Sequence, residues 1–511
     1  MPETSHYYWT GFLTFCFIAI GIGYISYRRI PALAPDHHEF WTAGKKISGW
    51  SAGLSISASM MSISWSCVYG VQLLYWYGVG GLWLLAIPWL LAMAGFFAVA
   101  PRLHRMTSFS QPEMVGARFG LRARQLLALP LAFVYLVWCG AEIYAAAHVL
   151  APLLDTSRAL MLVLIAGTVA TYSYLGGLTA VVATDRFQYF LAAFFIATIA
   201  GFGMNAVLQR ADFFDFLSSL PTPPKAQAPA TSLRSTGLAL MVMTFIAYLP
   251  GWSVTTDVWI KMQATRNSAE ARKGVAIAAF NSLVFIAVLP LCIGLSALYL
   301  YPPQNGVIPE RLQDGARIFT AMMQDFSPLS LSVFLAVGLA AVAMSTIDTT
   351  GNVLALSLSY DLLEISNTRW LSPHLRTNLP RYITLLAIAL ALLYALFIES
   401  LWDIFYLSSG ILTTTIFIPM VAVFIPSAKP RQVHAAILTG FVGTLSFYFL
   451  ETRGYLAGLQ PDWLAATGLG YILWGFIAAV LAFIGFGRIS STNSRALRHE
   501  GAEVGKASPP K

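Results

Sequence analysis

Apolar runs long enough to cross a membrane recur along this chain of 511 residues. Roughly 20 consecutive apolar residues cross the hydrocarbon core as a helix. Runs of this kind are centred near residues 18, 62, 92, 138, 167, 196, 247, 286, 344, 389, 413, 442 and 477. The pattern predicts an all-α integral membrane protein of about 13 transmembrane helices, with no room for a second folded domain.

A polar stripe interrupts one of these apolar helices. In the segment SVFLAVGLAAVAMSTIDTTGNVLALSLSYDLL, Ser345, Asp348, Thr349 and Asn352 are spaced by three and four residues, so they share one helical face. A carboxylate at mid-bilayer costs ~2.5–3.5 kcal/mol even on a mild insertion scale, so it normally faces a cavity, a partner or an ion. The stripe predicts that the chain handles something hydrophilic inside the membrane.

Two other apolar segments carry features that favour broken helices. The segment GWSAGLSISASMMSISWSCVYG is rich in serine, which permits local unwinding where the freed carbonyls line a cavity. Close packing against neighbouring helices is the alternative interpretation. In the helix centred near residue 247, Pro250 removes a backbone donor next to Gly251, and this predicts a break there.

The composition supports the membrane assignment, with 57% hydrophobic residues, 11% charged residues and a mean hydropathy of +0.67. With the N-terminus outside and the C-terminus inside, 24 of the 31 Lys and Arg residues fall in cytoplasmic segments, as expected for topogenic charge. The net charge of +8 therefore gives no reason to expect a nucleic-acid partner. The four cysteines lie in apolar spans without metal or redox spacing, and no ATP-binding motif is present, so an enzyme is not expected.

Four motifs resemble the sodium/solute symporter family. They lie within about residues 39–363 and read FWTAGKKISGWSAGLSISASMMS, YSYLGGLTAVVATDRFQ, KMQATRNSAEARKG and AAVAMSTID. The resemblance implies two inverted five-helix repeats, with broken first and sixth core helices, in the fold first seen in a bacterial leucine transporter. The expected parts are a peripheral N-terminal helix and cytoplasmic loop (1–47), the first repeat (48–208), an extracytoplasmic loop (209–235), the second repeat (236–426), two peripheral helices (427–488) and a disordered cytoplasmic tail (489–511).

The resemblance also implies a sodium site. Its ligands would be the backbone carbonyls of Ala58, Met61 and Val342 and the hydroxyls of Ser345 and Thr346. Positions 342, 345 and 346 share a helical face, and a small hard cation takes several oxygen ligands. On the residues alone, the two hydroxyls could instead bond to carbonyls one turn earlier in their own helix.

A second ion site is expected at Asp185, Asp348 and Thr349, because some family members place a second sodium near the matching aspartate. Asp185 at a helix start is also favourable for the helix dipole alone. Asp348 could alternatively bind a proton, so proton coupling stays open beside sodium coupling.

Candidate solute-binding residues fall at mid-depth of the first, third and sixth core helices. No Lys or Arg lies among them, which slightly favours an amine-bearing solute over a carboxylate. The candidates are Ser64, Trp65, Tyr69, Glu142, Trp252 and Thr255.

The expected function is sodium-coupled symport of a small organic solute by alternating access, in a multi-pass protein of a bacterial cell membrane. The alternatives are a proton-coupled symporter of the same fold and a membrane solute sensor that does not transport. The solute and the oligomeric state stay open.

Overall fold

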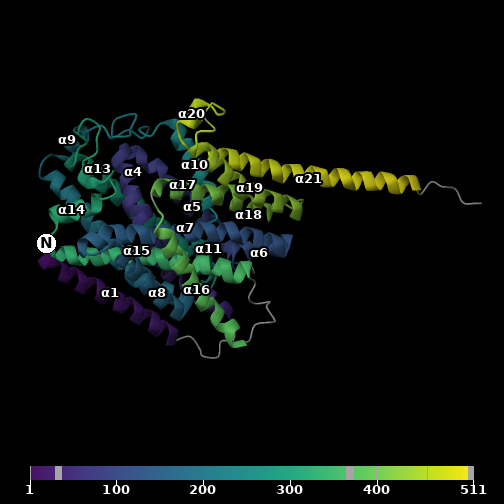
Figure 1. Cartoon of the computed structure of the whole chain (residues 1–511), viewed down its shortest axis with the longest axis horizontal. Coiled ribbons are helices and arrows are strands. Elements are labelled where there is room, and N and C mark those ends of the chain that lie inside the picture. The colour runs from purple at the N-terminus through teal and green to yellow at the C-terminus, as the bar shows by residue number, and fades with distance from the viewer. Residues whose placement is uncertain are drawn as a thin grey trace, which may run out of the picture.

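Helices make up nearly all of the structure, a computed structural model that describes residues 2–28, 37–106, 108–363, 373–398, 400–456 and 458–504. Within these ranges β-pairing is limited to isolated bridges, and eleven helices are long and apolar enough to cross a membrane. Figure 1 shows the helices gathered in one bundle, from which the C-terminal helix α21 projects. The prediction of an all-helical membrane protein is confirmed.

The first half of the bundle begins with a helix in two pieces and continues with longer helices. In order, these elements are α3 (Gly49–Met60), the π-helical turn η2 (Ile63–Tyr69), α4 (Gly70–Tyr77), α5 (Ala86–Leu103), the short α6 (Gln111–Phe119), α7 (Leu121–Leu153) and α8 (Arg158–Leu208). Inside α8, Gly177 has a φ of 53° and a ψ of −144°, so two helices meet there at a kink. A glycine suits this backbone because it has no Cβ to clash at positive φ.

The second half repeats this order of elements. Its members are α10 (Leu238–Trp252), α11 (Thr256–Gln263), α12 (Ser268–Ser282) with α13 (Leu289–Leu300), the short α14 (Ile318–Phe326), α15 (Leu329–Leu356), α16 (Pro373–Ala395), and α17 (Leu401–Ile411) with α18 (Ile418–Ala422). Helices α1 (Pro2–Arg28), α19 (Pro430–Thr452) and α21 (Gly470–Val504) flank the two halves. Helix α1 packs along α8 and α15, whereas α19 packs against α21.

The break after α3 has a local backbone cause. Met61 leaves the helical region with a ψ of 56°, and Ser62 is extended with a ψ of 143°. The Ser62 hydroxyl then accepts the N–H of Trp65 at 2.8 Å and caps the next helical segment. The serine-rich segment is therefore a broken helix.

The break in the second half lies slightly later than the sequence predicts. Helix α10 runs through Pro250 and ends at Trp252, and the chain is extended at Thr255. The side chain of Thr413 connects the backbone groups on either side of Pro250. Its hydroxyl accepts the N–H of Gly251 at 3.0 Å and donates to the carbonyl of Ala247 at 2.7 Å. A side chain inserted between the backbone hydrogen-bonding groups lets the helix continue for part of a turn. The break predicted at Pro250–Gly251 is therefore wrong in position.

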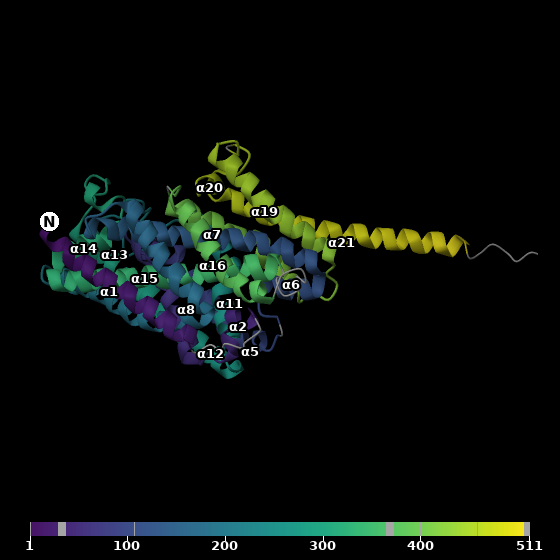
Figure 2. The same cartoon turned by 60° about the horizontal axis from the view of Figure 1, so that its bottom comes forward.

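Helix α21 continues to Val504, so the first part of the tail expected from residue 489 has a helical backbone in this structure. The sequence SRALRHE in this stretch contains Ala, Leu, Arg and Glu, which favour helix, and lacks Gly and Pro. Figures 1 and 2 show α21 extending beyond the bundle. Residues 505–511 lie outside the described ranges.

Helix α3 packs against α8, α11, α12 and α15. Its approach to α12 is close, since a Cβ at Gly53 would lie 2.7 Å from the Cβ of Ile277 and 2.8 Å from the carbonyl oxygen of Gly274. Only a residue without a side chain fits at this crossing. The close packing fixes the position of α3, from which two polar clusters are built.

Candidate ion and solute sites

The first polar cluster joins the end of α3 to the middle of α15. We call it the hydroxyl cluster. The hydroxyl of Ser345 donates to the carbonyls of Ala58 and Val342, each at 3.0 Å. The hydroxyl of Thr346 donates to the carbonyl of Ser59 at 3.0 Å and to that of Val342 at 3.4 Å. The two hydroxyls therefore reach both their own helix and the carbonyls at the end of α3.

The oxygens of the hydroxyl cluster suit a small hard cation. Ala58, Val342 and Ser345 are fully buried, and Thr346 is 8% exposed. The chain leaves the helical conformation at Met61, the remaining predicted ligand, which is also buried. Hydroxyl and carbonyl oxygens are the ligands that Na⁺ takes, and the cluster contains no basic side chain.

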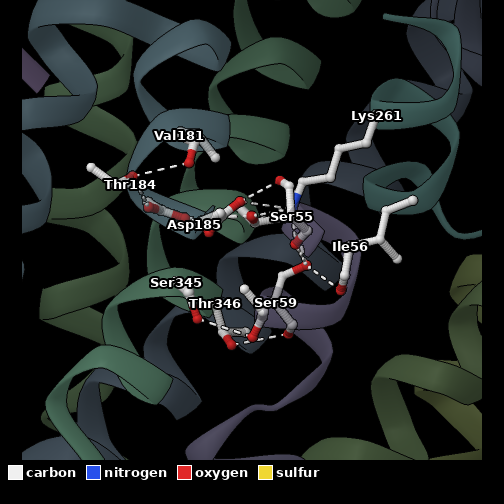
Figure 3. Close-up of polar contacts among 12 residues, drawn as sticks. Ser55, Ile56, Ser59, Val181, Thr184, Asp185, Lys261, Ser345 and Thr346 are labelled. Atoms are coloured by element: carbon white, nitrogen blue, oxygen red, sulfur yellow. Dashed lines mark hydrogen bonds and ion pairs between the residues drawn. The ribbon is translucent and has the colours of Figure 1, made fainter. Parts of the chain in front are cut away.

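The second polar cluster surrounds a fully buried lysine, and we call it the lysine cluster. The ammonium of Lys261 on α11 lies 3.2 Å from Oδ2 of Asp185 and 2.8 Å from the hydroxyl of Thr349. It also donates to the carbonyl of Ser55 at 2.9 Å and to the hydroxyl of Ser59 at 3.0 Å. Figure 3 shows Lys261 reaching toward Asp185 and Ser55, with Ser345 and Thr346 against Ser59.

The carboxylates of the lysine cluster have further partners. Asp185 also accepts the hydroxyl of Ser55. Asp348 accepts the hydroxyls of Tyr172 at 2.8 Å, Thr184 at 3.4 Å and Thr349 at 3.4 Å. The structure thus brings the three residues of the expected second ion site together, with Lys261 bonded to two of them.

Sequence reasoning missed Lys261 in this role. Lys261 is one of the 24 Lys and Arg residues that the sequence analysis assigns to cytoplasmic segments, whereas the structure buries its side chain completely. A lysine near the end of an apolar helix usually extends toward water, and its acidic partner lies 76 positions away in the sequence. Nothing local in the sequence signals the pairing.

A small cavity lies between the broken helices, with a volume of about 60 Å³. Of the six solute-binding candidates, Ser64, Trp65, Glu142, Trp252 and Thr255 line it. Tyr69 does not line it but packs against Phe405, which does, with ring centroids 5.3 Å apart. Five of the six candidates therefore converge.

Glu142 on α7 binds the start of the segment that follows the first break. Its carboxylate accepts the hydroxyls of Ser62 and Ser64. It also accepts the backbone N–H groups of Ile63 and Ser64, each at 3.2 Å. A buried carboxylate at a helix start is stabilised by these donors and by the helix dipole.

Aromatic rings form much of the cavity wall. The rings of Trp65, Trp89 and Trp252 meet edge to face, with centroid separations of 5.3 to 5.9 Å. Trp89, Trp138 and Phe405 were not among the sequence-based candidates, because aromatic residues are common on any face of a membrane helix. Asp257 is a further lining residue.

The cavity is continuous with both polar clusters. Ser59 and Thr346 line the cavity and take part in the hydroxyl cluster, and Thr349 lines it from the lysine cluster. An ion and a solute bound here would contact the same residues.

Comparison with known proteins gives consistent matches. The sodium:solute symporter family matches residues 40–440. The chain is 23% identical over 467 residues to the sodium/sialic acid symporter NanT of Aliivibrio fischeri, covering 87% of this chain and 86% of that protein. It is 24% identical over 419 residues to a sodium/glucose cotransporter of Vibrio parahaemolyticus, covering 75% and 74% of the two chains.

A solved structure shares the fold. It is the substrate-bound, outward-open state of a Na⁺-coupled sialic acid symporter, described as revealing a novel Na⁺ site. The TM-score is 0.70 at 16% identity, and the match covers 94% of this chain and 98% of that one. At this identity the likeness establishes the fold alone.

Proposed function

Because the chain belongs to the sodium:solute symporter family, we propose that it is a secondary active transporter that couples Na⁺ entry to symport of a small organic solute. The protein is a multi-pass membrane transporter and not an enzyme. We place it in the cell membrane of a bacterium, because the two relatives described above come from bacteria.

The observation that carries this proposal is that the hydroxyl cluster and the cavity share lining residues. The proposed Na⁺ ligands are the carbonyls of Ala58, Met61 and Val342 and the hydroxyls of Ser345 and Thr346. Thr346 also lines the cavity, where Ser64, Trp65, Glu142, Trp252 and Thr255 are the proposed solute contacts, with Tyr69 behind them. An ion that fixes α3 against α15 would shape the solute site, so each ligand would favour binding of the other.

The proposed topology has thirteen crossings with the N-terminus outside. Helix α8 has 51 residues, about 75 Å at 1.5 Å per residue, more than twice the ~30 Å of a hydrocarbon core. We therefore count α8 as two crossings that meet at Gly177. The span Ile63–Leu103 also counts as two, and these two divisions raise the eleven spanning helices to thirteen. The repeats 48–208 and 236–426 are then inverted.

Transport would proceed by alternating access. The first two helices of each half, α3 to α5 and α10 to α13, would rock against the remaining scaffold around the cavity. Na⁺ held between α3 and α15 would stabilise whichever state best joins these helices, since a ligand shifts an equilibrium only by its differential affinity.

Thermal stability of the purified chain in detergent would test the ion site. Melting temperatures in Na⁺ buffer are compared with those in K⁺ buffer of equal ionic strength, for the native chain and for the double variant Ser345→Ala/Thr346→Ala. We expect a rise in melting temperature that is specific for Na⁺ and absent from the double variant. A Na⁺ response that survives in the double variant would place the ion elsewhere.

Proton-coupled symport is the second candidate, and the buried, hydroxyl-bonded Asp348 is the observation that favours it. A native chain with no Na⁺ response, whose solute uptake into proteoliposomes follows an imposed proton gradient and is lost in Asp348→Asn, would support that candidate. Gradient-independent solute binding without uptake would instead indicate a sensor.

A further inference from the structure

The charges that line the cavity are all negative. Glu142 and Asp257 contribute carboxylates, and none of the described lining residues is Lys, Arg or His. Asp257 is buried and accepts the hydroxyl of Tyr135 at 2.9 Å, a neutral partner. Neither carboxylate takes part in an ion pair with a described residue. The described lining therefore carries negative charge only, and the nearest ammonium, that of Lys261, lies behind Thr349 and is paired with Asp185.

The N-terminus of the helical segment η2 would attract an anionic solute, but the carboxylate of Glu142 already occupies it. The N–H groups at the beginning of a helix, together with its dipole, form an anion site. Here the carboxylate of Glu142 accepts the N–H groups of Ile63 and Ser64 and the hydroxyls of Ser62 and Ser64. A solute carboxylate would lose these donors and meet the charge of Glu142.

The aromatic wall suits a positive charge. Trp65, Trp89, Trp138 and Trp252 line the cavity together with Phe405, and the faces of such rings attract ammonium groups. The cavity holds about 60 Å³, far below the several hundred Å³ of pockets for drug-sized ligands. Its size limits the bound group to a small one.

On the basis of the proposed function, we propose that the transported solute is a small organic cation, an amine or a quaternary ammonium compound. Its charged group lies against the tryptophan rings and near Asp257. Glu142 acts as a specificity residue, because it occupies the helix start and repels anions.

The test uses a charged probe and a neutral probe of the same shape. Choline and its uncharged carbon analogue 3,3-dimethylbutan-1-ol are titrated into the full chain in detergent with Na⁺, and tryptophan fluorescence and melting temperature are recorded. Tetramethylammonium and acetate complete the series. We expect the two cations to bind at least tenfold more tightly than the neutral analogue, and acetate not to bind.

Asp257→Asn should abolish most of this preference, because the amide can still accept the Tyr135 hydroxyl but carries no charge. Asp215→Asn, at an exposed position, is the matched control and should change nothing. Equal or tighter binding of the neutral probe or acetate would overturn the proposal. So would the failure of both cations to bind while the Na⁺ response is intact. Loss of the Na⁺ response itself would count against the proposed function instead.

Independently, the lysine cluster leads to an inference about ion stoichiometry. Lys261 directs its ammonium to four oxygens, on Asp185, Thr349, Ser55 and Ser59. Asp185 and Asp348 together carry two negative charges when ionised, and Lys261 supplies one positive charge. One further monovalent cation would balance the net charge of these three groups. Asp348 lies one helical turn from Ser345, so a cation at the hydroxyl cluster is suitably close.

We infer that Lys261 is a built-in cation at the second ion site, so that transport uses a single Na⁺. This inference also rests on the proposed function. Equilibrium binding of radioactive Na⁺ to the full chain measures the stoichiometry. We expect one ion per native chain, one in Lys261→Arg, which keeps the charge, and two in Lys261→Met, which opens the site.

Two ions in the native chain, or one in a folded Lys261→Met, would overturn the single-Na⁺ inference. Should Lys261→Met not fold, the native chain and Lys261→Arg still decide the question through their counts. A native chain that binds no Na⁺ would contradict the proposed function.

Discussion

The hydroxyl cluster and the lysine cluster both involve α3 and α15, but they differ in the charge of their polar groups. Both take α3 on one side and α15 on the other, and both are buried. The hydroxyl cluster contains neutral oxygens, whereas the lysine cluster contains two carboxylates and an ammonium. A cation held by neutral oxygens can leave during each cycle, but a charge tethered to α11 stays. The difference suggests one exchangeable and one permanent positive charge around α3.

The largest effect is expected from breaking the lysine cluster. Asp185→Asn leaves the buried charge of Lys261 without its ion-pair partner, and breaking a buried pair from one side costs ~3–5 kcal/mol. We expect the melting temperature in detergent to fall steeply. The double variant Asp185→Asn/Lys261→Met removes both charges and should recover a large part of the loss. A double variant no more stable than Asp185→Asn would contradict the role of Lys261 as a paired cation.

The hydroxyl cluster should respond differently, in ion affinity rather than in stability. Ser345→Ala/Thr346→Ala removes two proposed Na⁺ ligands, and hydrogen-bond-strength contacts to a charge are worth ~1.5–3 kcal/mol. At ~1.4 kcal/mol per factor of ten, Na⁺ affinity should fall by at least tenfold. A Na⁺ titration of the melting temperature measures this loss. Thr346→Ser keeps the hydroxyl and should bind Na⁺ nearly as the native chain does; a loss as large as that of the double variant would argue against the hydroxyl as a ligand.

The two clusters also show what the sequence could reveal. The spacing of Ser345, Asp348 and Thr349 predicts a shared helical face, and the structure brings all three into the clusters. The hydroxyl of Ser345 donates to the carbonyls of Ala58 and Val342, two positions that the family resemblance assigns to the sodium site. The lysine cluster could not be predicted, because Lys261 and Asp185 meet only when α8 and α11 pack on α3. Periodicity describes one helix at a time and contains no information on such contacts.

The breaks in the helices illustrate the same limit. Pro250 predicts a weakened helix correctly, but the position of the break depends on Thr413, which is 162 residues from Gly251 and repairs the ladder. The same limit applies to the cavity. In the sequence, Trp89, Trp138 and Phe405 cannot be distinguished from membrane-facing aromatic residues, but in the structure they line the cavity. Local chemistry predicts a tendency, and tertiary contacts decide where it is realised.

Helix α3 supplies oxygens to both clusters, so moving it should disturb both. In Gly53→Ala the new Cβ would lie 2.7 Å from the Cβ of Ile277, and overpacking of this kind costs ~1–3 kcal/mol. We expect lower stability together with weaker Na⁺ binding. Gly95→Ala is the control, because nothing lies within 4 Å of a Cβ there. Lower stability with unchanged Na⁺ affinity would show that the hydroxyl cluster does not depend on the packing of α3.

The smallest effect is expected at an exposed ion pair, whose lysine also lies 3.1 Å from the centroid of the Trp76 ring. Lys225 lies 3.3 Å from Asp314, and the two side chains are 41% and 56% exposed. Exposed pairs are worth ~0–1 kcal/mol and exposed cation–π contacts ~0.5–1 kcal/mol, so Lys225→Gln should still change stability less than Asp185→Asn does. Partial burial lowers the pKa of Lys225 below its ordinary value of 10.5, although Asp314 opposes this shift.

The unfolded chain therefore binds this proton more readily than the folded chain does. As the pH rises toward 10.5, stability of the native chain should increase slightly relative to Lys225→Gln. Thermal unfolding of both proteins at matched pH gives this difference, in which the titration of all other groups cancels. A large loss of stability in Lys225→Gln near neutral pH would mean that exposure does not separate the two lysines. The contrast between a tethered internal cation and an ordinary surface ion pair would then fail.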